Sequence, residues 1–194
     1  MPEVELPNPE ELEELREKSF TRRTALLTAV YAVFLAVVSL GGNNAAKEMS
    51  LSQQQASDQW AYYQAKSMRE QLYRIERLRL EDELVERGKA LAGEALAHKQ
   101  GLQQSAAQEE RRYAGEKKEI EEKARELEHE RDRNLARDPY FDFGEVLLQI
   151  AIVLASMSIL TRARPIFHAS LVAAVLGVTL GLNGYFLLFR LPFL

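Results

Sequence analysis

The chain has no cysteine, one tryptophan and three histidines among its 194 residues. The missing cysteine excludes disulfides and thiol chemistry, and it is compatible with either side of a membrane. The histidines, His98, His129 and His168, stand apart and lack the spacing of metal ligands. We therefore expect no metal site within one chain.

Motifs that carry chemistry are also missing. There is no glycine-rich phosphate loop, no G-x-S-x-G and no cysteine nucleophile. The acidic run 126–132 lacks the glycine and the oxygen spacing of a calcium loop, so it is typical of a solvated helix face. A net charge of -4 disfavours nucleic acid as a partner. We expect a protein that is not an enzyme and binds no cofactor.

The apolar residues are concentrated in three blocks, Thr24–Gly42, Phe143–Leu160 and Pro165–Phe189. About 20 apolar helical residues cross a hydrocarbon core of about 30 Å. The first block has 19 residues without a charge, and only Thr161–Arg164 separates the second from the third. The blocks predict three transmembrane helices, the last two forming a tight hairpin, with the lipid bilayer as a partner.

Lysine and arginine near the ends of the blocks set the expected orientation. Arg16, Lys18, Arg22 and Arg23 precede the first block, and Arg162 and Arg164 lie in the hairpin, so both regions should be cytoplasmic. Arg131, Arg133 and Arg137, ahead of the second block, argue the other way. The predicted order is a cytoplasmic segment with a short helix at 1–23, spans at 24–46, 143–161 and 165–190, and a charged, periplasmic insert at 47–142.

The insert is strongly charged and favours helix. It holds 18 Lys or Arg and 21 Asp or Glu, and it has no proline before Pro139. Since it leaves and re-enters the same membrane face, we expect two antiparallel helical arms with their turn within Gly88–Gly101. The predicted fold class is an all-α membrane protein, with three transmembrane helices and a long, coiled-coil-like helical hairpin between the first and second.

Heptad spacing predicts the face on which the arms meet. On the first arm it selects Ala61, Ala65, Met68, Leu72 and Ile75, and on the return arm Ala106, Tyr113, Ile120, Leu127 and Asn134. A seam with so little apolar surface is marginal for one chain. Either several copies associate or the membrane spans hold the arms together, and we expect a homo-oligomer.

The stretch "QASDQWAYYQAK" at 55–66 contains Trp60, Tyr62 and Tyr63. Trp60 lies about 14 residues beyond the first span, about 20 Å along a helix, which is too far for a membrane belt. The predicted seam leaves Trp60 and Tyr63 on the opposite side of the arm. We expect these three residues to form a patch for another subunit or a protein partner.

Small residues four apart let helices approach closely in lipid. Such a face runs through Ala169, Ala173, Gly177 and Gly181 on the third span, with similar sets at Thr28, Ala32 and Ala36 and at Ala151 and Ala155. These faces serve packing within one subunit, an interface between subunits, or both.

Four amides lie near the outer ends of the spans: Asn43, Asn44, Gln149 and Asn183. They could form an intramembrane polar layer, either as hydrogen-bonded clamps between helices or as the lining of a pore.

Two helix ends are also predicted. Near the N-terminus, Asn8 is expected to cap a short helix that begins at Pro9. Near the end of the insert, Asp138 and Pro139 are expected to stop the return arm.

Two stretches, "ASDQWAYYQAK" and "FDFGEVLLQIAIVLASMSILTRAR", resemble the signatures of a bacterial membrane-protein family catalogued as a domain of unknown function. The resemblance extends over most of the chain from the first span onward. It implies three spans with a charged helical insert and a place in the bacterial inner membrane, and it supplies no activity or ligand.

Two functions follow from these patterns. The first is a non-enzymatic, membrane-anchored scaffold or interaction protein that self-associates through its spans and its hairpin. The alternative is a subunit of an oligomeric membrane pore or transport complex, with the four amides along its path.

Overall fold

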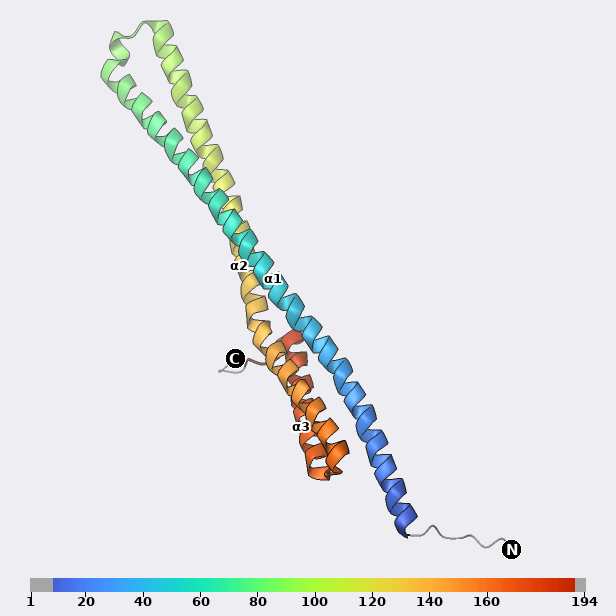
Figure 1. Ribbon diagram of the computed structural model, residues 1–194. Helices are drawn as coiled ribbons and strands as arrows, with labels where there is room; N and C mark the ends of the chain where they lie inside the picture. Colours follow the sequence, from blue (N-terminus) through green and yellow to red (C-terminus); the bar gives the residue numbers. More distant parts are fainter. Residues whose placement is uncertain (1–8, 191–194) are drawn as a thin grey trace. The chain divides into compact units, whose positions relative to one another are not determined.

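The computed structural model describes residues 9–190, and these are helical throughout apart from short connections. The elements are α1 (Pro9–Arg87), a 3-10 turn η1 (Gly88–Ala90), α2 (Gly93–Thr161) and α3 (Arg164–Phe186) (Figure 1). No strand occurs between residues 9 and 190. The break between α1 and α2 falls inside the range Gly88–Gly101 predicted for the turn.

The chain divides into two compact units. The span unit comprises residues 9–48 and 133–190 of the described chain, and the arm unit is Met49–Asp132. α1 and α2 each belong to both units: the N-terminal part of α1 and the C-terminal part of α2 lie in the span unit, and the rest of each helix lies in the arm unit.

The core of the span unit is built from residues seven apart on α1 and α2. On α1 the buried positions are Thr24, Tyr31, Val38 and Ala45, a spacing that keeps one stripe of a helix facing its neighbours. α2 contributes Phe141, Leu148, Ala151 and Ala155, and α3 contributes Ala173 and Ala174. The three helices therefore share one narrow apolar core.

Glycines bring α2 and α3 into close contact. A Cβ added at Gly177 would lie 2.9 Å from the carbonyl oxygen of Gly144, and one added at Gly144 would lie 3.0 Å from that of Gly177. Gly181 packs directly against Val38 of α1. Small residues at such positions allow the backbone contact that associates helices in lipid.

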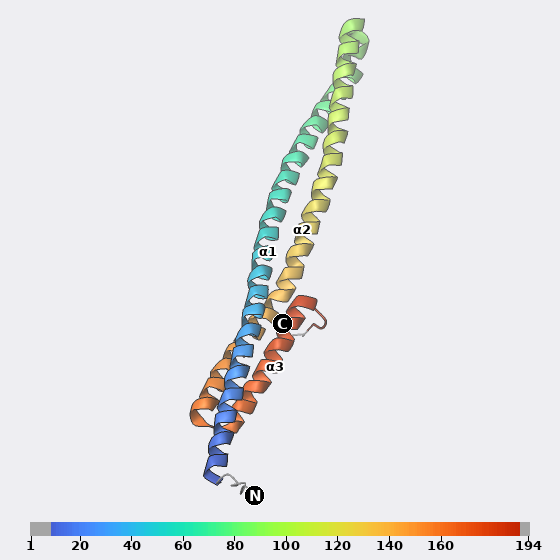
Figure 2. The same cartoon turned by 90° about the vertical axis from the view of Figure 1, so that its right-hand side faces the viewer.

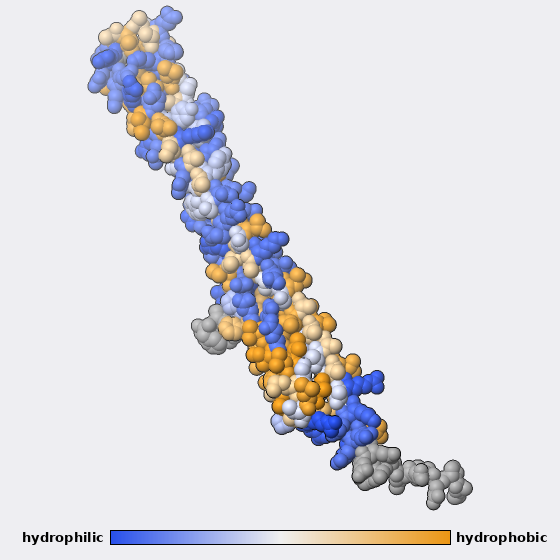
Figure 3. Space-filling model, in the orientation of Figure 1, coloured by the Kyte–Doolittle hydropathy of each residue, from blue (hydrophilic) through white to orange (hydrophobic). Residues whose placement is uncertain are grey.

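The outward surface of the span unit is apolar. Each of the three helices is long and apolar enough to cross a membrane, and in the most apolar 18-residue window of α1 only 22% of the residues are buried. Leu26, Val33 and Val172 are examples of large apolar side chains that face outward. In Figure 3 the surface of this unit is largely orange, whereas that of the arm unit is mainly blue.

Three expectations about helix ends differ from the structure. Pro139 lies inside α2, so the prediction that Asp138 and Pro139 stop the return arm is wrong. A proline inside a helix costs about 3 kcal/mol, but here the continued helix buries Tyr140 and Phe141 to 2% and 3% exposure. The helix expected to be short near the N-terminus continues from Pro9 without a break as α1, and Asn8 lies outside the described residues.

The third apolar helix ends before its expected limit of residue 190. α3 stops at Phe186, and Leu187 adopts a left-handed conformation with φ of 48°. The Leu187 amide donates to the Asn183 carbonyl oxygen over 2.7 Å, which closes the last turn.

Candidate functional site

The two arms of the arm unit lie side by side in antiparallel directions (Figures 1 and 2). Ion pairs join them along their length, and the partners on α2 lie at 116 and 117 for Lys66 and Glu70 but at 110 and 99 for Arg77 and Glu83, as antiparallel arms require. The pairs are Lys66–Glu116 at 2.5 Å, Glu70–Lys117 at 2.6 Å, Arg77–Glu110 at 2.7 Å and Glu83–Lys99 at 2.5 Å. The face between the arms is therefore polar as well as apolar.

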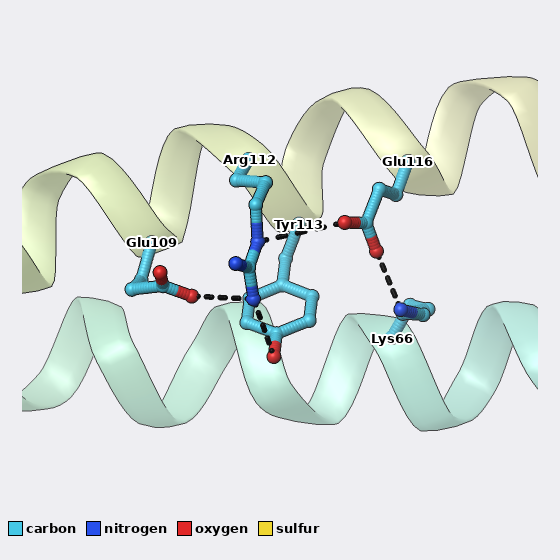
Figure 4. Close-up of polar contacts among 5 residues, drawn as sticks. All are labelled: Lys66, Glu109, Arg112, Tyr113 and Glu116. Atoms are coloured by element: carbon cyan, nitrogen blue, oxygen red, sulfur yellow. Dashed lines mark hydrogen bonds and ion pairs between the residues drawn. The ribbon is translucent and has the colours of Figure 1, made fainter.

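Tyr113 of the second arm points towards the first arm (Figure 4). Its side chain is buried, and its ring stacks on that of Tyr73 with centroids 5.7 Å apart. The Arg112 guanidinium donates to the Tyr113 hydroxyl over 3.0 Å and also pairs with Glu109 at 2.7 Å. The Tyr73–Tyr113 pair, with Arg112 and Glu109 beside it, therefore joins the two arms near the middle of their length.

The charged contacts shift the pKa values of these groups in the directions expected for ion pairs. The hydrogen bond from Lys66 lowers the pKa of Glu116 below its ordinary value, and the same contact raises the pKa of Lys66. Arg69 first, and then Arg112, lower the pKa of the Tyr113 phenol. Each shift favours the charged form of its group, and for Lys66 and Glu116 this strengthens the pairing between the arms.

Trp60 takes part in the same face. Its indole Nε1 donates to the Glu128 carboxylate over 2.9 Å, and its ring meets Tyr63 edge to face at 5.4 Å. The Lys117 ammonium lies 5.6 Å from the centre of the Tyr63 ring. The prediction that Trp60 and Tyr63 face away from the other arm is wrong, and of the proposed patch only Tyr62 is mainly exposed.

The apolar face predicted as the seam of the first arm is instead exposed. Met68, Leu72 and Ile75 are 66%, 60% and 63% exposed, and Ala61 and Ala65 are exposed too. We call these five residues the outer stripe. The arms meet through the opposite face of α1, because its lysine, glutamate and arginine side chains find partners on α2.

The seam predicted for the return arm is confirmed at most positions. Ala106, Tyr113, Ile120 and Asn134 are buried, and Leu127 is partly buried. Only α2 therefore presents to the other arm the face that its heptad spacing indicates.

The four amides expected as a polar layer have local partners or face outward. Asn183 is 1% exposed. Its side-chain nitrogen donates to the Phe189 carbonyl oxygen, and its side-chain oxygen accepts from the Phe189 amide, which closes the end of α3. Gln149 donates to Glu145 on its own helix over 3.2 Å. Asn43 and Asn44 are exposed. No hydrogen bond within residues 9–190 joins any two of the four.

The small-residue face of α3 lies partly in the core. Ala173, Gly177 and Gly181 are buried, and Ala169 is exposed. On α2, Ala151 and Ala155 are fully buried. On α1, Ala32 and Ala36 face outward while Tyr31 and Val38 face the core, so these two alanines do not pack within the subunit, and an interface between subunits stays a prediction for them.

The positive segments before the first and third apolar blocks lie together at one end of the span unit. Phe20 of α1 meets Phe167 of α3 edge to face at 5.5 Å, and Arg162 pairs with Glu17 at 2.6 Å. Both segments were expected on the cytoplasmic side from their charge. Their contact agrees with a common side.

Among residues 9–190, no group of three or more histidine, aspartate or glutamate side chains is placed to hold a metal ion. These features define an all-helical protein with three helices long and apolar enough to cross a membrane. The chain belongs to a family described as a domain of unknown function (DUF4337), whose model matches residues 20–187. Neither a curated protein nor a solved structure matches the chain.

Proposed function

We propose that the protein is a non-enzymatic scaffold of the bacterial inner membrane that self-associates through the outer stripe of its first arm. The observation that carries this proposal is the exposure of Met68, Leu72 and Ile75, each at 60% or more, on a helix whose opposite face already holds the second arm. Large apolar residues grouped on one face mark an interaction surface.

The spacing of the outer stripe fits a helical partner. Its members follow one another at intervals of four and three residues, which is the pattern of the contact positions of a coiled coil. A second copy of the chain presents the same stripe, so an apolar face meets an apolar face. A symmetric pair is the commonest arrangement of soluble oligomers.

Membrane anchoring makes this pairing parallel. Two copies with the same three spans in one bilayer present their first arms in the same direction, so Leu72 meets Leu72 of the other copy. In a parallel pair, Arg69 then faces Gln64 of the other copy, and Glu76 faces Gln71. No like charges oppose each other at these flanking positions.

The orientation in the membrane follows from the charged ends. Arg16, Arg22, Arg23 and Arg162 gather at one end of the span unit, which we assign to the cytoplasmic side. The arm unit, with its inter-arm ion pairs, is then outside the cytoplasm. The apolar outward surface of the span unit faces lipid.

Cysteine cross-linking tests the proposal, and the absence of native cysteine makes single labels unambiguous. Met68→Cys in native membranes should form a disulfide-linked dimer on mild oxidation, because the parallel pair places the two copies of residue 68 together. Arg74→Cys is the matched control, since Arg74 is exposed on the same arm but away from the outer stripe. Equal cross-linking of both variants, or of neither, contradicts the proposal.

A further inference from the structure

Three arginines surround one pocket at the end of the span unit where α1 begins. Arg16 and Arg23 come from α1 and Arg164 from α3, and the cavity has a volume of about 650 Å³. Its other lining residues are Leu12, Leu15, Ser19, Phe20, Thr24 and Phe167. No carboxylate is among the lining residues, and none of the three arginines pairs with an acidic side chain that the structure describes.

A neighbouring pocket contains carboxylates. Arg16 and Arg164 line it too, together with Arg162, Glu13 and Glu17, and Glu17 pairs with Arg162 at 2.6 Å. The charge of Arg16, Arg23 and Arg164 has no such partner among the described residues. The larger pocket is thus electropositive and suited to an anion.

The start of α3 adds to this positive field. Ala163 precedes the helix without a side-chain cap, and Arg164 and Phe167, in the first turn, line the pocket. The dipole at a helix N-terminus favours an anionic group, whereas Pro165 supplies no amide hydrogen. Arg164 and Phe167 bring this helix end to the pocket that the arginines line.

Most of the remaining pocket wall is apolar, although Ser19 and Thr24 also line it. The Phe20–Phe167 pair lies towards the apolar blocks, and Leu12 and Leu15, 42% and 59% exposed, lie on the other side of Arg16. A free inorganic anion would use the arginines and leave this surface in water. A molecule with an anionic head and an apolar body would cover both.

The position of the pocket along the chain fits the edge of a membrane. Thr24 begins the first uncharged block, and Pro165, next to Arg164, begins the third. In a membrane-embedded span unit the arginines therefore lie at headgroup level, where basic pockets between helices bind anionic lipids.

We infer that this pocket binds an anionic phospholipid, with the phosphate held by Arg16, Arg23 and Arg164 and the acyl chains running past Phe167 into the bilayer. The inference rests on the proposed membrane anchoring. It goes beyond general attraction to a charged surface, because it assigns the lipid to three particular arginines.

Native mass spectrometry of the full chain in mild detergent tests the site. Phosphatidylglycerol and phosphatidylcholine with the same acyl chains are added in equal amounts, and lipid adducts are counted per subunit. The wild type should retain phosphatidylglycerol preferentially. Arg23→Gln should lower that retention about five-fold, as expected for one arginine near an anionic headgroup.

Arg22→Gln is the matched control. Arg22 is the next residue and carries the same charge, but it lines a different pocket with Glu14 and Glu17. This variant should retain phosphatidylglycerol like the wild type, and Arg23→Lys should keep part of the binding. Helical circular dichroism of each variant shows that the fold is kept.

Two outcomes would overturn the inference: no preference for phosphatidylglycerol in the wild type, or an equal loss in the Arg22 and Arg23 variants. Displacement of the lipid by millimolar inorganic phosphate would assign the site to free phosphate, and this also overturns it. The same spectra count subunits. Lipid bound to monomers therefore contradicts only self-association, whereas lipid-free oligomers contradict only the lipid site.

Discussion

The indole of Trp60 on α1 donates a 2.9 Å hydrogen bond to the carboxylate of Glu128 on α2. The two residues are 68 positions apart in the sequence, and their contact joins the two arms. Because Trp60 is the only tryptophan of the chain, its fluorescence reports directly on this contact.

Glu128→Ala should destabilise the arm unit and shift the Trp60 emission to longer wavelength, because the indole N–H then turns to water. Loss of one such hydrogen bond costs about 1 kcal/mol. Glu126→Ala is the control, since Glu126 carries the same charge and is exposed on the same helix. Thermal unfolding followed by fluorescence measures both effects, and identical behaviour of the two variants contradicts the contact.

Gly177→Ala should destabilise the span unit by about 1–3 kcal/mol, because the added methyl group lies 2.9 Å from the Gly144 carbonyl oxygen. Gly115→Ala is the counterpart in the arm unit, where no atom lies within 4 Å of the added Cβ. It should stabilise by about 0.5–1 kcal/mol through helix propensity. Thermal unfolding in detergent should separate the two variants, and a harmless Gly177 substitution would contradict the close helix contact.

Acid should loosen the arms. Lys99 lowers the pKa of Glu83, and Lys66 lowers that of Glu116. A lowered folded-state pKa gives stability that is complete above the unfolded value, about 4.3, and is lost as pH falls through the folded value. Spin labels at Gln71→Cys and Arg111→Cys should show a narrow distance distribution at neutral pH that broadens below about pH 4.

Glu116→Gln is the control for this titration. It should broaden the distance distribution at neutral pH and reduce the further change in acid, because one of the titrating pairs is already lost. An arm separation that is independent of pH from neutral to about pH 3 would contradict the role of these pairs.

The orientation can be tested with single cysteines at the two ends. A membrane-impermeant maleimide should label Gln100→Cys in cells whose outer membrane alone is permeabilised. Glu14→Cys should be labelled only after the inner membrane is disrupted. The reverse pattern would overturn the assignment of the arm unit to the outside.

The return arm could be predicted from the sequence because its buried positions, such as Ala106, Tyr113 and Ile120, are also its heptad-spaced apolar positions. The first arm could not, because its inner face carries Lys66, Glu70 and Arg77. Apolar spacing selects the outer stripe. The inner face consists of charged residues whose partners lie on the other arm, so the sequence of the first arm alone does not indicate it.

The same limit applies to the span unit and the helix ends. The apolar blocks were sufficient to predict three long apolar helices. The core face of α1 could not be predicted from small-residue spacing, because it carries the large Tyr31 and Val38 while the small Ala32 and Ala36 point outward. Pro139 indicated a stop, and burial of Tyr140 and Phe141 directly after it favours continuation.

The most direct test of self-association through the outer stripe is the mass of the full chain in mild detergent, compared with Leu72→Glu and Arg74→Glu. Burying one leucine side chain contributes about 1.5–3 kcal/mol, so a charge at residue 72 should weaken association at least ten-fold. The account predicts two or more chains for the wild type and for Arg74→Glu, and single chains for Leu72→Glu. A monomeric wild type, or an oligomer that Leu72→Glu leaves intact, would contradict it.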